Sequence, residues 1–151
     1  MKVSVASDMD TPVARAVVEE LRRRGHEAVV HGALSEGERA DWAWACERAA
    51  RDVADGDAQQ GIVCCWTGTG ASIAANKVAG IRAALCGDAE TARGARTWND
   101  ANVLALSLRT TSEPLLEEIL DGWFATAPSD DPSDRANVEH VEALDAARAQ
   151  S

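Results

Sequence analysis

The sequence lacks several features that would assign it to a large functional class. No apolar run approaches the roughly 20 residues of a membrane-spanning helix, and no basic segment followed by an apolar stretch marks a signal peptide. We therefore expect a cytoplasmic protein with no membrane partner. Positive charge is scarce, because 15 Lys and Arg against 25 Asp and Glu give a formal net charge of −10. This balance argues against a nucleic-acid partner, although a few local arginines can still form a pocket for a small anion.

Metal-binding and nucleotide-binding patterns are also missing. The four cysteines have neither CxxC nor His-paired spacing, so no zinc site is expected. Cys64 and Cys65 are adjacent and would point to opposite faces of a strand, so no disulfide is expected between them. The third glycine of a dinucleotide-binding G-x-G-x-x-G would fall at Ile73, and the Walker spacing is absent.

What the chain does contain is a regular alternation of strand-like and helix-like segments. Strands are predicted at 2–7, 27–31, 60–65, 81–86 and 103–106. Helices are predicted at 12–24, 41–55, 88–97, 113–125 and 134–149, with a further short helix that ends at Gly80. Such βαβ units predict the α/β class, as a three-layer, Rossmann-like, doubly wound parallel sheet of about five strands. Ligands of such folds bind beyond the carboxyl ends of the strands.

The C-terminal region differs from the rest. Residues 1–126 hold all the predicted strands, whereas 127–151 comprise a turn-rich linker and a charged final helix within the same single domain. No strand is predicted after that helix, but one side of it carries an apolar stripe. We therefore expect it to dock on a partner subunit.

The most informative stretch is 61–77, which reads as a buried strand, a glycine-containing turn and a helix. Cys65 stands at the end of the strand. The turn and the helix N-terminus offer backbone N–H groups to negative charge, and a helix N-terminus favours a reactive thiolate. The alternative is that Cys65 is a small buried hydrophobe, and the residues alone leave both interpretations open.

Residues 65–77 (CWTGTGASIAANK) and 78–83 (VAGIRA) resemble the signature of the ribose-5-phosphate isomerase B / galactose-6-phosphate isomerase family. The resemblance continues at 98–105 (WNDANVLA), and 3–8 (VSVASD) fits the family's first strand. It extends from residue 2 to at least Trp123 and is weak in the C-terminal helix.

The resemblance implies an enzyme that interconverts aldose and ketose phosphates through an enediolate, without metal or cofactor, at a subunit interface of a homodimer or tetramer. By position, Cys65 would be the base that moves a proton between C1 and C2, and Thr67 would assist transfer between the two oxygens. The amides of Gly68, Thr69 and Gly70 would hold the enediolate. A carbon acid needs such a positioned base and oxyanion site.

The resemblance also implies substrate-binding residues. Asp8 and Asn99 would bind sugar hydroxyls, and Arg109 would lie near the phosphate. Arg135 would supply one of the two tail arginines that reach a partner's phosphate, in a register that the sequence leaves ambiguous.

Four positions depart from the family pattern. Met9 and Trp98 stand in the places of histidines, of which the one at 98 opens the sugar ring; Trp42 replaces a tyrosine and Trp66 a glycine. We expect the three tryptophans to line one pocket, where indole faces can stack on sugar C–H faces or planar groups. For Trp44 and Trp123, core packing is the alternative role. The pocket is thus predicted to be more apolar and less phosphate-directed than in relatives.

Three functions remain open on the sequence alone. The first is an aldose–ketose isomerase with a substrate other than ribose 5-phosphate, such as a tetrose or tetrulose 4-phosphate, whose esterified terminal oxygen prevents furanose closure. The second is an isomerase or epimerase of an unphosphorylated or aromatic-bearing substrate. The third is a sugar-binding homologue without catalysis.

Overall fold

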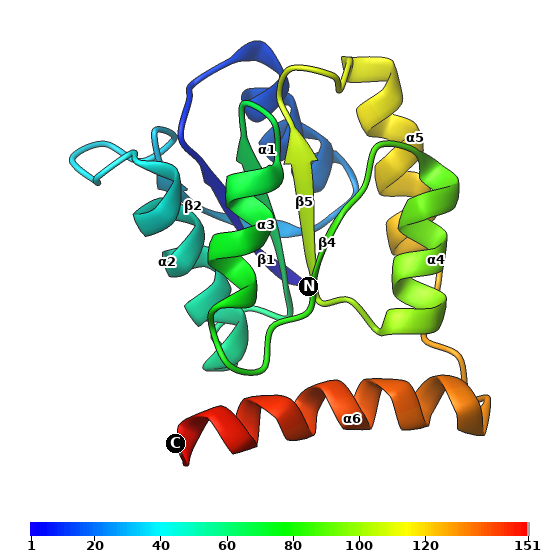
Figure 1. Ribbon diagram of the computed structural model, residues 1–151. Helices are drawn as coiled ribbons and strands as arrows, with labels where there is room; N and C mark the ends of the chain where they lie inside the picture. The colour runs from blue at the N-terminus through cyan, green and yellow to red at the C-terminus, as the bar shows by residue number, and fades with distance from the viewer. Residues whose placement is uncertain (151) are drawn as a thin grey trace.

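The chain forms a parallel five-stranded sheet between two layers of helices, in a computed structural model that describes residues 1–150 (Figure 1). The strands are β1 (Lys2–Ser7), β2 (Glu27–Gly32), β3 (Gln60–Cys65), β4 (Ala83–Leu85) and β5 (Val103–Ser107). Their order is β2-β1-β3-β5-β4. The helices are α1 (Pro12–Arg23), α2 (Trp42–Ala54), α3 (Thr69–Asn76), α4 (Ala89–Asn99), α5 (Glu113–Phe124) and α6 (Pro132–Ala149). The predicted fold class is confirmed.

The two faces of the sheet are covered by different kinds of side chain. Large residues of α1 and α5, such as Leu21, Leu116 and Ile119, pack on one face together with α4. Mainly small residues of α2 and α3, such as Ala49 and Ala75, pack on the other. Small side chains let α2 and α3 lie close to the sheet and to each other, so the carboxyl end of β3 is tightly enclosed.

Strand β4 is shorter than predicted because asparagine side chains, and not a neighbouring strand, accept hydrogen bonds from the backbone amides at its start. The amide of Arg82 donates to Asn102 Oδ1 at 2.8 Å, and the amide of Ala83 donates to Asn76 Oδ1 at 2.8 Å. Helix α4 is longer than predicted and ends at Asn99; Asp100, which follows it, adopts a left-handed conformation with φ 44°.

The two tryptophans expected in the core differ. Trp123 is fully buried, and its indole Nε1 donates to Gln60 Oε1 at 2.9 Å, which confirms the prediction. Trp44 is 47% exposed, and the Arg39 guanidinium lies over its ring at 3.5 Å. The prediction for Trp44 is wrong because its position on α2 faces outward.

Helix α6 crosses beneath the amino edge of the sheet of its own chain (Figure 1). Asp145 accepts a hydrogen bond from the Gly80 amide at 2.8 Å, and Glu142 pairs with Arg82 at 3.2 Å. Val141 and Leu144 remain exposed. Within residues 1–150, no helix combines the length and apolarity needed to cross a bilayer.

Replacing Trp123 tests the larger core. We expect Trp123→Phe to lower the free energy of unfolding by about 2 kcal/mol, because it leaves a void and an unpaired Gln60 oxygen. Trp44→Phe is the matched control and should cost at most about 1 kcal/mol, since it loses mainly a cation–π contact. Urea denaturation followed by circular dichroism measures both; equal losses would contradict the assignment of Trp123 to the core.

Candidate active site

The candidate site is built around Cys65, the last residue of β3, whose side chain is only 5% exposed. Its Sγ accepts a hydrogen bond from the amide of Ala71 at 3.4 Å. Ala71 lies in the first turn of α3, so the positive end of a helix is directed at the sulfur. The thiol therefore lies at the N-terminal end of α3.

The turn between β3 and α3 requires glycine at position 68. Gly68 has φ 76°, and a Cβ there would lie 2.9 Å from the Leu106 carbonyl carbon and the Ser107 nitrogen. The carbonyl of Trp66 accepts hydrogen bonds from Ser107 Oγ at 3.0 Å and from the Arg109 amide at 2.9 Å. These two hydrogen bonds hold the turn against the end of β5.

The same turn leaves donors open beside the thiol. The amides of Thr69 and Gly70 begin α3 and find no acceptor within residues 1–150. The hydroxyls of Thr67 and Thr69 are 2.7 Å apart. This arrangement can accept an oxyanion next to Cys65, as the sequence analysis predicts for an enediolate.

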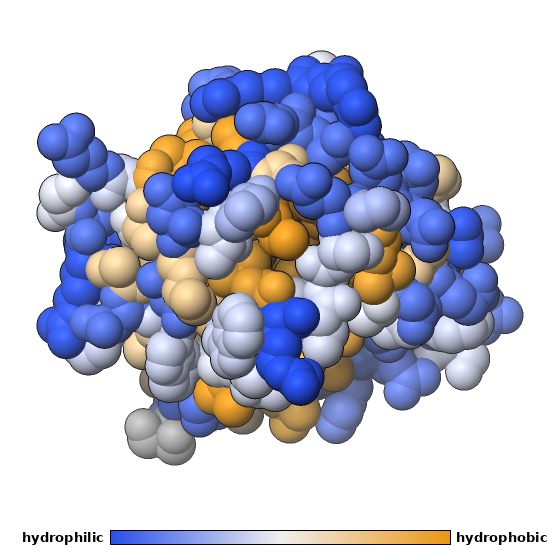
Figure 2. Space-filling view, turned by 90° about the horizontal axis from the view of Figure 1, so that it is seen from above, coloured by the Kyte–Doolittle hydropathy of each residue, from blue (hydrophilic) through white to orange (hydrophobic). Residues whose placement is uncertain are grey.

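Large apolar side chains surround this turn at the carboxyl edge. A Cβ at Gly70 would lie 2.9 Å from the Trp42 ring, so Trp42 stacks directly on the start of α3. Met9 and Trp66 are also exposed, Trp66 by 51%. Figure 2 looks down on this edge and shows hydrophobic residues gathered at its centre with hydrophilic ones around them.

Asp8 follows β1 at the same edge, and its Oδ1 is buried without a hydrogen-bond partner in the described chain. Burial raises the pKa of Asp8, a backbone hydrogen bond opposes the rise, and the negative charge of Asp41 adds to it. This oxygen is therefore free to accept a hydrogen bond from a hydroxyl group.

The other three cysteines have no such environment. Burial raises the pKa of Cys46 to about 12 and that of Cys86 to about 11, and it also raises the pKa of Cys64. All three therefore remain neutral thiols at neutral pH and behave as small core residues.

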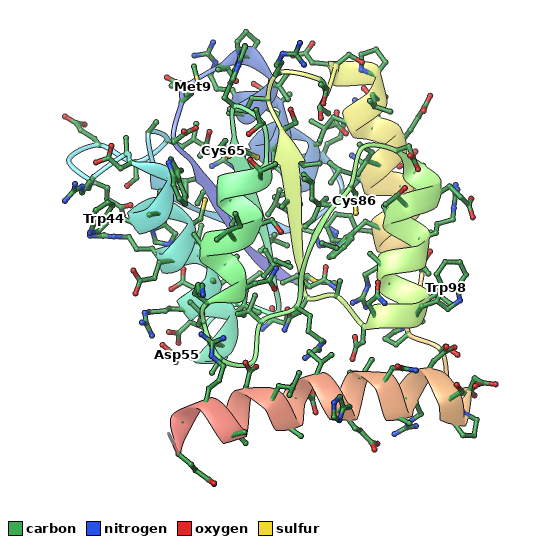
Figure 3. The ribbon with its side chains drawn as sticks, viewed as in Figure 1. Met9, Trp44, Asp55, Cys65, Cys86 and Trp98 are labelled. Atoms are coloured by element: carbon green, nitrogen blue, oxygen red, sulfur yellow. The ribbon has the colours of Figure 1, made fainter. Side chains whose placement is uncertain are left out.

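Three predicted site residues lie elsewhere in the chain. Trp98 and Asn99 end α4, and they line a cavity of about 280 Å³ between α6 and residues 81–84. Arg135 lines an adjoining cavity together with Trp98. Figure 3 shows Cys65 near the carboxyl edge and Trp98 at the far end of α4. The expectation that three tryptophans line one pocket is therefore wrong for a single chain, because α4 carries Trp98 away from Trp42 and Trp66.

Both arginines predicted near phosphate are unpaired. The guanidinium groups of Arg109 and Arg135 make no hydrogen bond or ion pair within the described part of the chain. Most other arginines are paired with carboxylates, so these two cations are available to an anion.

Sequence reasoning missed two contributors to the site. It did not single out Ser107, whose hydroxyl fixes the Trp66 carbonyl, although a serine that ends a buried strand is a usable signal. It also did not single out Ala71, because its contribution is a backbone amide. Among residues 1–150, no group of three or more His, Cys, Asp and Glu side chains is arranged to hold a metal ion.

The raised pKa of Asp8 predicts a pH-dependent effect on stability. The folded state favours the protonated carboxyl, so this contribution is fully present below the usual pKa and is lost as pH rises through the raised one. Asp8→Asn should therefore raise Tm at pH 7, and the gain should shrink toward about pH 3. Asp10→Asn, at an exposed neighbour paired with Arg15, is the control and should not raise Tm. A pH-independent effect of Asp8→Asn, measured by calorimetry, would contradict the burial argument.

Comparison with known proteins agrees with this geometry. Residues 3–141 match the family model described as Ribose/Galactose Isomerase. The chain is 38% identical to ribose-5-phosphate isomerase B of Escherichia coli (strain K12) over 132 residues, which cover 87% of each protein. It is 47% identical to D-erythrulose-4-phosphate isomerase of Pectobacterium atrosepticum over 75 residues, about half of each protein.

The fold comparison gives the same result. The structure of type B ribose 5-phosphate isomerase from Trypanosoma brucei matches with a TM-score of 0.86 and 40% identity, covering 95% of this chain and 97% of that one. Family model, sequence identity and fold therefore agree over nearly the whole length, and the chain belongs to the ribose/galactose isomerase family of sugar-phosphate isomerases.

Proposed function

We propose that this chain is an aldose–ketose isomerase of a small sugar phosphate, with Cys65 as the base. The observation that carries the proposal is the hydrogen bond from the Ala71 amide to the Cys65 sulfur, beside two amides without acceptors, those of Thr69 and Gly70. A base and an oxyanion site next to each other are what proton transfer at a carbon beside a carbonyl requires.

The proposed chemistry uses the groups of this turn. The Cys65 thiolate takes a proton from C1 or C2, according to the direction, and the electron pair forms the C1–C2 double bond of an enediolate. The open amides stabilise its oxyanion, and the Thr67 hydroxyl passes a proton between the two oxygens. Return of the proton from sulfur to the other carbon completes the isomerisation.

We propose that the site is completed by a second copy of the chain, in a homodimer or a larger even assembly. Support comes from the division of the predicted residues into two groups on one chain: Asp8 and Arg109 lie with Cys65 at the carboxyl edge, whereas Asn99 and Arg135 lie at the end of α4 and the start of α6. The exposed Trp98, Val141 and Leu144 give the second group an apolar surface suited to a partner. In this proposal 127–151 is the segment that docks.

We further propose that the substrate is not ribose 5-phosphate but a sugar phosphate that is already open, such as a tetrulose 4-phosphate. Trp98 has no group that can transfer a proton to open a ring, and Met9 likewise lacks one. The partial match to a D-erythrulose-4-phosphate isomerase supports this choice. The unpaired Arg109 supports a phosphorylated substrate.

One observation favours a second candidate, an isomerase of an unphosphorylated or aromatic-bearing substrate. Trp42 and Trp66 are both exposed at the carboxyl edge, where they could stack on a planar group. The two candidates differ in whether Arg109 has a ligand.

A substrate panel tests the first candidate. We expect exchange of the carbon-bound proton in deuterated water, followed by NMR, to be at least about tenfold faster with D-erythrulose 4-phosphate than with ribose 5-phosphate, because only the latter needs its ring opened. Cys65→Ala should lower this exchange by at least about a hundredfold, whereas Cys86→Ala, at a buried thiol, should retain activity. Faster turnover of ribose 5-phosphate would contradict the open-chain substrate, and exchange with free erythrulose alone would favour the second candidate.

Mixing two inactive variants tests the shared site. Cys65→Ala and Asn99→Ala each damage one group of residues, so a mixed dimer retains one site with both groups intact. Random reassociation after co-refolding should restore about a quarter of wild-type activity, while either variant refolded alone stays inactive. No recovery, with mixed dimers verified by native mass spectrometry of one tagged variant, would contradict a site built from two copies.

A further inference from the structure

A cluster of partly buried polar side chains near the candidate site has no part in the chemistry described above. His31 lies near the end of β2, and its ring stands between two carboxylates. Its Nε2 is 2.7 Å from Asp52 Oδ2, and its Nδ1 is 3.2 Å from both oxygens of Glu38. The side chains of His31, Glu38 and Asp52 are only 14%, 20% and 27% exposed.

Each partner joins the ring to a different part of the fold. Asp52 lies on α2 and also accepts a hydrogen bond from Ser4 Oγ of the neighbouring strand β1 at 2.8 Å. Glu38 lies in the loop 33–41 and also accepts from the Gly32 amide at 2.9 Å. The His31 ring therefore ties the loop, the helix and the sheet together.

The charges around the ring are complementary. Both ring nitrogens face carboxylate oxygens, and only the imidazolium form donates from both. Arg48 of α2 lies 3.6 Å from Glu38 and places a cation beside that carboxylate. Burial acts to raise the pKa of Glu38, but the Gly32 amide and His31 outweigh it and hold the pKa below its usual value.

The loop that Glu38 closes leads directly into the site. It ends at Asp41, and Trp42 begins α2 with its ring against Gly70 of α3. The next amide of α3, that of Ala71, is the one that donates to Cys65. A shift of the start of α2 would therefore change the wall that covers the thiol.

We propose that His31 and Glu38 are positioning residues, which fix the loop 33–41 so that Trp42 closes the site over Cys65. The inference rests on the proposed function for its catalytic consequence, but the positioning itself can be measured without any substrate. A displacement of about 1 Å in a residue that lines an active site is enough to lower the rate of the chemical step tenfold or more.

The experiment uses two variants and two matched controls. His31→Gln and Glu38→Ala break the cluster. His26→Gln removes a histidine at the amino edge, which stacks on Phe124, and Glu36→Ala removes an exposed acid of the same loop. All are assayed well below their own Tm, so that an unfolded fraction contributes nothing.

The first readout is alkylation of Cys65 by iodoacetamide, located by peptide mass spectrometry with Cys65→Ala as the blank. We expect a rate at least about fivefold higher in His31→Gln and Glu38→Ala and a rate within twofold of wild type in both controls. An unchanged rate in both cluster variants, with only Tm lowered, would overturn the proposal and leave the cluster a purely structural one.

The second readout is kcat with the best substrate of the panel. We expect about a tenfold loss of kcat with a smaller change in KM. Unchanged kcat in both cluster variants would overturn the proposal for an active enzyme. If the wild-type protein isomerises none of the sugars, the proposed function fails, while alkylation of Cys65 still decides the positioning role.

Discussion

The site depends on one constraint, the absence of a side chain at residue 68. With φ 76° and the backbone of β5 only 2.9 Å from where a Cβ would be, Gly68 lets the chain reverse directly at the end of β3. Helix α3 then starts close enough for the amide of Ala71 to reach the Cys65 sulfur. A wider turn would separate the thiol from the helix N-terminus, and the parallel sheet would present an ordinary buried cysteine.

Much of this could be predicted from the sequence because local rules suffice for it. The alternation of β-rich and helical segments defined the doubly wound sheet, and the glycines of 65–70 marked the turn. The boundaries of β4 were not predictable in the same way. The side chains of Asn76 and Asn102 accept hydrogen bonds from the amides of Ala83 and Arg82, and strand periodicity carries no signal for such side-chain contacts.

The location of the tryptophans shows a second limit. Sequence reasoning grouped Trp98 with Trp42 and Trp66 by resemblance, yet α4 carries Trp98 away from the carboxyl edge and leaves it 58% exposed. Core packing is also the alternative that the sequence offers for Trp44, yet its place on α2 turns the ring toward Arg39 and solvent. The residue type indicates which interactions a side chain can make. The direction of its helix, and its position on that helix, decide where in the molecule it makes them.

The stacking of Trp42 on Gly70 has a consequence for sequence drift. A methyl group at 70 would lie 2.9 Å from the indole, so a larger residue there would require Trp42 to shift. A smaller side chain at position 42 would leave room for a larger residue at position 70. While Trp42 is present, a larger residue at position 70 would meet the indole. Among homologues that keep this helix pair, the two sites should evolve in a fixed order, with the aromatic lost before the glycine.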